Sequence, residues 1–98
     1  MSRRILFRPQ AEVEALDAWA WYAERQLETA RRFTLELNRC IDRIQATPEM
    51  CPLVDPPLRR ALLRHFPYAV FYRVSDDEIV IVSCFHVRRN PKVWRQRR

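Results

Sequence analysis

Residues 58–94 read LRRALLRHFPYAVFYRVSDDEIVIVSCFHVRRNPKVW, and this stretch decides the fold. It contains three runs rich in β-branched and aromatic residues, separated by Phe66-Pro67 and by Ser75-Asp76-Asp77. Residues of these types favour a pleated, half-buried surface, and the two breaks are typical of turns. The stretch therefore predicts a meander of three strands.

Two of these runs indicate which faces are buried. In the first, Val70, Tyr72 and Val74 share one face, because side chains alternate along a strand. The next run is apolar on both faces, which is typical of a strand with neighbours on each side. Its two sets are Ile79, Ile81 and Phe85 on one face and Val80, Val82 and Cys84 on the other. We therefore expect this run to be the central strand.

The first 46 residues predict a strand and two helices. Residues 3–8 alternate loosely, as in a short strand, and Pro9 suits the first turn of a following helix. Apolar residues then recur at helical spacing over residues 10–26 and again over residues 28–46. The two stripes are Val13, Leu16, Ala20, Ala23 and Leu27, then Ala30, Phe33, Leu37, Ile41 and Ile44. The short connection between them predicts an antiparallel helical hairpin.

Residues 48–57 contain four prolines and predict an irregular crossing loop. The order strand, helix, helix, three strands (β-α-α-β-β-β) predicts an α+β fold, with the helical hairpin packed on one face of a small antiparallel sheet. We expect the first strand to join the edge beside the last strand. A chain of 98 residues has the size of one domain, residues 1–98.

The net charge of +6 is concentrated at one end of the chain. Residues 88–98 contain six cations and no acid, whereas residues 1–87 balance twelve cations with twelve acids. Seventeen of the eighteen cations are arginine, which suits bidentate contact with carboxylate or phosphate. The basic end predicts an anionic partner, either nucleic acid or an acidic peptide, unless it is simply a solvated tail.

Composition argues against several classes of function. The chain has no glycine, so it lacks the glycine-rich loops that hold nucleotide phosphates. Cys40, Cys51 and Cys84 have no metal-ligand spacing and read as reduced thiols. No apolar run approaches the ~20 residues of a membrane span. We expect a cytoplasmic protein with no cofactor, no metal and no membrane partner.

A group of large aromatic residues, Trp19, Trp21 and Tyr22, lies beside the predicted apolar stripe of the first helix. Three side chains of this size have more apolar surface than one small sheet can cover. They either widen the core or form an exposed patch that a partner buries. The helix phase that decides between Trp19 and Trp21 as the outward residue stays open.

Five motifs in order give the chain a family resemblance over nearly its whole length. They are Ala-Glu-Arg (23–25) with Ala-Arg-Arg-Phe (30–33), the proline-rich crossing, Leu-Arg-Arg (58–60), Phe-Pro-Tyr-Ala-Val-Phe-Tyr-Arg-Val (66–74), and the ending His86-x-Arg88-Arg89-Asn90-Pro91 followed by Trp94. The set resembles the RelE/ParE superfamily, the toxins of type II toxin–antitoxin pairs, also described as plasmid-stabilisation proteins. The resemblance implies a cognate antitoxin whose C-terminal segment folds along the toxin. It implies that Trp19, Trp21 and Tyr22 bind this antitoxin in a hetero-oligomer.

Two mechanisms occur on this fold, so the resemblance alone does not choose between them. RelE-like members are ribosome-dependent mRNA endonucleases, which use sheet-face lysines and arginines with a C-terminal aromatic, whereas ParE-like members inhibit DNA gyrase. Here Ala69 stands where a RelE-like arginine is expected, and Lys92 is the only lysine. Trp94 matches the aromatic but cannot act as an acid. The departures favour the ParE-like branch.

We expect the target to contact a surface at one sheet end. Its predicted residues are Arg60, His86, Arg88, Arg89 and Trp94. If the protein is a nuclease, His86 is the candidate base with Arg88 and Arg60 beside it. His86 can equally serve as a structural residue at the strand end, and His65, Tyr68 and Tyr72 are weaker candidates that fit structural roles better. A third alternative is a small nucleic-acid-binding domain whose basic end contacts phosphate.

Overall fold

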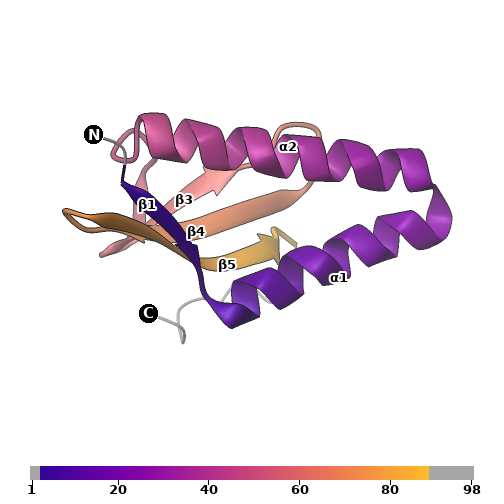
Figure 1. The fold of residues 1–98 in the computed structure, drawn as a ribbon, viewed down its shortest axis with the longest axis horizontal. Helices are drawn as coiled ribbons and strands as arrows, with labels where there is room; N and C mark the ends of the chain where they lie inside the picture. Colours follow the sequence, from indigo (N-terminus) through magenta and orange to yellow (C-terminus); the bar gives the residue numbers. More distant parts are fainter. Residues whose placement is uncertain (1–2, 89–98) are drawn as a thin grey trace.

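The computed structural model describes residues 3–88 and has the predicted α+β architecture (Figure 1). Its elements in order are β1 (Arg4–Phe7), α1 (Pro9–Arg25), α2 (Leu27–Ala46), β2 (Leu53–Asp55), β3 (Leu58–Leu62), β4 (Tyr68–Val74) and β5 (Glu78–His86). The two helices form the expected hairpin, because only Gln26 separates them. Neither helix in this part of the chain has the length and apolarity needed to cross a bilayer.

The five strands form one sheet in the order β1-β5-β4-β3-β2. The first strand joins the edge beside the last, as predicted, but β1 runs parallel to β5, from Arg4 opposite Glu78 to Phe7 opposite Ile81. The sheet is therefore mixed rather than wholly antiparallel. β5 has neighbours on both sides, but β4 is the middle strand because β2 adds a fifth member.

The prediction that residues 48–57 are wholly irregular was wrong, because β2 lies within them. β2 has three residues and pairs with β3 alone, at the edge of the sheet. An edge strand needs hydrogen bonds on one side only, so neighbouring prolines do not prevent it. Pro56 and Pro57 form the turn into β3.

An irregularity in β5 shifts its face pattern. Phe71 lies opposite Ser83, whereas Tyr72 lies opposite Ile81, so β5 contains an extra residue between them. Such a bulge reverses the alternation beyond it. Cys84, not Phe85, therefore joins Ile79 and Ile81 in the core under the helices, and Phe85 packs with Val80 and Val82 on the other face.

The predicted core stripe of α1 was also wrong. Val13 and Leu16 are 55% and 66% exposed, while Ala11 and Ala18 are buried and Ala15 packs against them. Small side chains let the helix backbone approach the sheet closely, which the larger residues do not. The predicted stripe of α2 is confirmed, and Cys40 and Glu36 extend it.

Apolar residues fill both faces of the sheet. The main core lies between the helices and the sheet, and four of its aromatic rings contact one another edge to face or tilted: Tyr22, Phe33, Phe66 and Tyr68. The second cluster lies on the opposite face and contains Leu58, Ala69, Phe71, Val80 and Val82. This separation decides which candidate site residues can meet.

Candidate functional site

The end of β5 holds the predicted histidine. His86 lies opposite Tyr68, and their rings meet edge to face with centroids 5.2 Å apart. The backbone N–H of Arg88 donates to Nδ1 of His86 at 3.2 Å, and that of Val87 donates to the carbonyl of Pro67 at 2.9 Å. These bonds hold the strand end and place the exposed Arg88 just after His86.

Arg60 does not join them. It lies on β3 opposite Phe71, whose side chain belongs to the cluster on the face away from the helices. His86 instead contacts Tyr68 and lines a pocket with α1, on the helix-covered face. The predicted group of Arg60, His86 and Arg88 is therefore divided between two faces of the sheet. Arg89, Lys92 and Trp94 lie outside the described residues.

Beside His86 is a pocket of about 250 Å³. Its lining residues are Glu14, Asp17, Ala18, Trp21, Tyr68, Cys84, Phe85 and His86. The side chains facing His86 across this pocket thus include two carboxylates. A nuclease site needs a cation near the scissile phosphate, and two acids in that position disfavour phosphate binding.

Glu14 was missed by the sequence analysis. β1 ends at Phe7 beside Ile81, so the outer edge of β5 beyond Ile81 has no strand partner among the described residues. Oε1 of Glu14 accepts hydrogen bonds there from the Ser83 hydroxyl at 3.1 Å and the Cys84 N–H at 3.2 Å. The available signal was its helical spacing from Ala11 and Ala18. This spacing places Glu14 on the same side of α1 as these two buried alanines, which face the sheet.

The aromatic residues of α1 divide between surface and core. Trp19 and Trp21 are 38% and 42% exposed, so both point outward. The guanidinium of Arg25 covers one side of Trp21, 3.6 Å from its ring centroid. Tyr22 packs against Phe33 and Phe66 instead, so it belongs to the core and not to the predicted open patch. The helical period turns Tyr22 toward the sheet together with Ala11, Ala15 and Ala18.

A largely apolar groove of about 360 Å³ runs between α1 and α2. Its lining residues are Ala15, Leu16, Trp19, Phe33, Thr34 and Leu37. Leu16 and Trp19 form its exposed margin, and Val13 continues that margin along α1. All three are among the large apolar residues that the structure leaves exposed.

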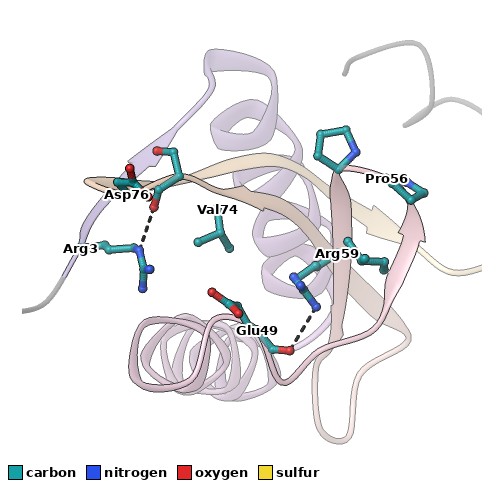
Figure 2. A pocket seen from close by; sticks show the side chains of 9 residues that line it. Arg3, Glu49, Pro56, Arg59, Val74 and Asp76 are labelled. Atoms are coloured by element: carbon teal, nitrogen blue, oxygen red, sulfur yellow. Dashed lines mark hydrogen bonds between the residues drawn. The ribbon is translucent and has the colours of Figure 1, made fainter.

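A larger hollow of about 410 Å³ lies at the other end of the sheet (Figure 2). Arg3 donates to the carbonyl of Ser75 at 2.8 Å, and Arg59 donates to the carbonyls of Glu49 and Cys51 at 3.1 and 2.7 Å. These bonds tie the N-terminus and the crossing loop to the sheet. Val74, in this hollow, lies about 20 Å along β4 from Tyr68, so the hollow is separate from the His86 pocket.

The other titratable candidates have structural positions. The Tyr72 hydroxyl is buried and donates to the carbonyl of Pro48 at 2.7 Å, and burial raises its pKa far above the ordinary value. His65 is exposed and has a φ of 68°, with Nε2 4.0 Å from a carboxylate oxygen of buried Glu36. Neither arrangement presents an acid or base to a substrate.

The thiols are free and mostly buried. Burial raises the pKa of Cys84 to about 12, with smaller contributions from Glu14 and Cys40. Burial likewise raises the pKa of Cys40 to about 11, against the opposing effect of Arg43. In residues 3–88, His, Cys, Asp and Glu side chains form no group of three that could hold a metal ion.

Comparison with known proteins adds the family. Residues 5–91 match the family model described as the ParE toxin of the type II toxin–antitoxin system parDE. Toxin ParE2 of two Mycobacterium tuberculosis strains is 28% identical over 92 residues, covering 93% of this chain and 88% of the relative. A solved structure described as the chromosomal ParDE TA system from P. aeruginosa superposes with a TM-score of 0.75 at 17% identity. That superposition covers 86% of this chain and 95% of the other, and it shows the same fold.

Proposed function

Since the chain belongs to the ParE toxin family of type II toxin–antitoxin systems, we propose that a cognate antitoxin neutralises it and that the free protein inhibits DNA gyrase. The separation of Arg60 from His86 is the observation that favours an inhibitor over a nuclease. A gyrase target implies a cytoplasmic protein. The surface proposed to contact gyrase begins at His86 and Arg88 and continues into Arg89 and Trp94.

Chemistry argues against RNA cleavage at this site. Attack by a ribose 2′-hydroxyl requires a base, a cation on the phosphate and an acid for the leaving oxygen. The pocket at His86 supplies the carboxylates of Glu14 and Asp17 in place of a cation. Ala69 is 1% exposed on the opposite face, and Tyr72 is fully buried, so neither position adds a catalytic group.

The groove between α1 and α2 is our proposed antitoxin site. An antitoxin segment that folds as an amphipathic helix would lay its apolar face along Leu16 and Trp19. Both side chains are partly exposed in the free protein, and covering them removes apolar surface from water. Trp21 lies on the other side of α1, where it lines the pocket at His86, and Tyr22 packs in the core, so neither ring lines this groove.

A supercoiling assay with purified gyrase tests the proposed target. We expect the protein to reduce supercoiling, and Arg88→Glu to weaken inhibition because it reverses an exposed charge at the proposed contact. Arg31→Glu is the matched control, since Arg31 is exposed on α2 and pairs with Glu28 at 3.6 Å. Unchanged supercoiling at saturating protein would remove the gyrase proposal.

Primer extension on translated message separates the nuclease alternative. Cleavage at defined codons, lost in His86→Ala and Arg88→Ala, would support a RelE-type activity. Intact message together with inhibited gyrase would support the proposal.

A further inference from the structure

The pocket beside His86 combines acidic and aromatic side chains. Glu14 and Asp17 lie about one helical turn apart on α1, and both line the pocket. Trp21 and Tyr68 line it as well. Its volume of about 250 Å³ is below that of pockets for drug-sized ligands and suits one long side chain.

The charged groups of this pocket are acidic. Oε1 of Glu14 accepts two hydrogen bonds from β5, which hold the carboxylate in place. Asp17 is exposed and forms no ion pair within 4.0 Å with a cation of residues 3–88. His86 adds no positive charge in this arrangement, because its Nδ1 accepts the Arg88 N–H and therefore carries no proton. The pocket is thus suited to a cation.

The aromatic lining favours a planar cation. Trp21 already contacts one guanidinium, since that of Arg25 lies 3.6 Å from the ring centroid. The face of an aromatic ring attracts cations, and a guanidinium can both stack on a ring and pair with carboxylates through parallel hydrogen bonds. A lysine ammonium is a compact, strongly hydrated charge that does not stack in this way. The lining therefore favours arginine over lysine.

We propose that this pocket binds the guanidinium group of an arginine side chain. The guanidinium pairs with Glu14 and Asp17, and the aliphatic stem of the arginine lies against Trp21 and Tyr68. The arginine comes either from a partner protein or from residues 89–98 of this chain. The candidates within the chain are Arg89, Arg95, Arg97 and Arg98. The site is distinct from the groove between the helices, and the inference does not depend on gyrase inhibition.

The two other hollows described above are less suited to a cation. The hollow at the opposite end of the sheet is lined by two arginines, Arg3 and Arg59, together with two acids, Glu49 and Asp76. The groove between α1 and α2 has no charged residue in its lining. The lining of the His86 pocket, by contrast, contains two acids and no lysine or arginine.

The test uses the full-length chain and three capped amino acids, the N-acetyl methylamides of arginine, citrulline and lysine. Citrulline has nearly the shape of arginine but no charge. Titrations followed by the NMR signals of the Trp21 indole N–H and the His86 ring measure the affinities. We expect the arginine compound to shift both signals. The citrulline compound should bind at least about fivefold more weakly, because it lacks the ion pairs and the cation–π contact. The lysine compound should fall between them.

Variants of the lining assign the contacts. Asp17→Asn and Glu14→Gln should each weaken the arginine compound roughly two- to fivefold, the range for one partly exposed ion pair. Trp21→Leu, followed by the His86 ring signal, should reduce the preference for arginine over lysine. Asp42→Asn is the matched control, because Asp42 is an exposed acid on α2 outside the pocket lining. It should leave binding unchanged.

A full-length variant separates the two sources of the arginine. It carries the substitutions Arg89→Gln, Arg95→Gln, Arg97→Gln and Arg98→Gln. Tighter binding of the arginine compound to this variant than to the unchanged chain would show that the chain's own arginines compete for the pocket. Equal affinities would assign the pocket to a partner's arginine. Equal binding of the arginine and citrulline compounds would overturn the proposal, as would normal binding by Asp17→Asn or no binding to either chain.

Discussion

Glu14 Oε1 lies 3.2 Å from the backbone nitrogen of Cys84, although 70 residues separate the two in the sequence. The contact completes a sheet edge that β1 is too short to reach, because the register of β1 ends opposite Ile81. At this point the Glu14 side chain accepts the hydrogen bond from the Cys84 N–H, which the backbone of a neighbouring strand would otherwise accept. The bond also links the helical hairpin directly to the bulged part of β5.

Replacing Glu14 with alanine should lower the free energy of unfolding by about 1–3 kcal/mol, because the Cys84 N–H and the Ser83 hydroxyl lose their acceptor. Glu14→Gln keeps an acceptor oxygen and should cost less. Urea denaturation at pH 7 measures both. Glu12→Ala, an exposed acid on the same turn, is the control and should change stability by no more than about 0.5 kcal/mol. Equal losses at both positions would refute the assigned role.

The buried thiols predict a loss of stability in alkali. The pKa values of Cys84 and Cys40 are raised from 9.0 to about 12 and about 11, so folding favours the neutral thiols. Their contribution is complete below pH 9 and is lost as the pH rises through 9 toward the folded-state values.

Denaturation at pH 7 and pH 10 measures this effect, with an expected loss of about 1 kcal/mol per thiol. Cys84→Ser removes one titrating group and should reduce the difference between the two pH values. Cys51→Ser, at a partly exposed position, is the comparison. An unchanged pH difference in Cys84→Ser would contradict the prediction.

The groove between the helices predicts a specific effect on antitoxin binding. Leu16→Glu introduces a charge at a side chain that is 66% exposed in the free toxin, so the fold should tolerate it. A carboxylate buried in the apolar contact should weaken the complex by at least about 2 kcal/mol, roughly thirtyfold. Isothermal titration calorimetry with the cognate antitoxin measures the change. Leu35→Glu, 48% exposed on α2 and not in the groove lining, should bind normally.

Replacement of Tyr72 distinguishes a structural role of its hydroxyl from a catalytic one. Tyr72→Phe removes the hydroxyl that donates to Pro48 at 2.7 Å and should lower the free energy of unfolding by about 0.5–1.5 kcal/mol. Growth inhibition by the folded variant should match that of the unchanged protein. Loss of toxicity with unaltered stability would instead assign the hydroxyl to the chemistry.

Local sequence patterns predicted which segments form helices and strands better than they predicted which side chains of those elements are buried. Alternation along β4 correctly assigned Val70 and Tyr72 to one face, because that strand has no extra residue. The same argument failed in β5 beyond the bulge at residues 82–83, since a single insertion reverses every later side chain. On α1, large apolar residues marked the exposed side and alanines the buried one, so hydrophobicity alone selected the wrong stripe.

Predictions about the site failed where they required distant segments to meet. The basic residues of segments 58–60 and 86–88 were predicted to form one cluster. The strand register instead places Arg60 and His86 on opposite faces of the sheet. Glu14 belongs to no sequence motif. Its hydrogen bonds with Ser83 and Cys84 depend on the packing of α1 beside β5, which the local sequence does not reveal. β2 was not predicted because the prolines around it usually indicate a loop. A strand at the edge of a sheet tolerates such prolines.

The parallel pairing of Arg4 with Glu78 has a consequence for biosynthesis. β1 is synthesised before β5 and has no strand partner until residues 78–81 have emerged. The sheet therefore stays incomplete until β5 has been synthesised, when β5 takes its place between β1 and β4. The helical hairpin precedes β5 in the chain, so it emerges while β1 still lacks its strand partner.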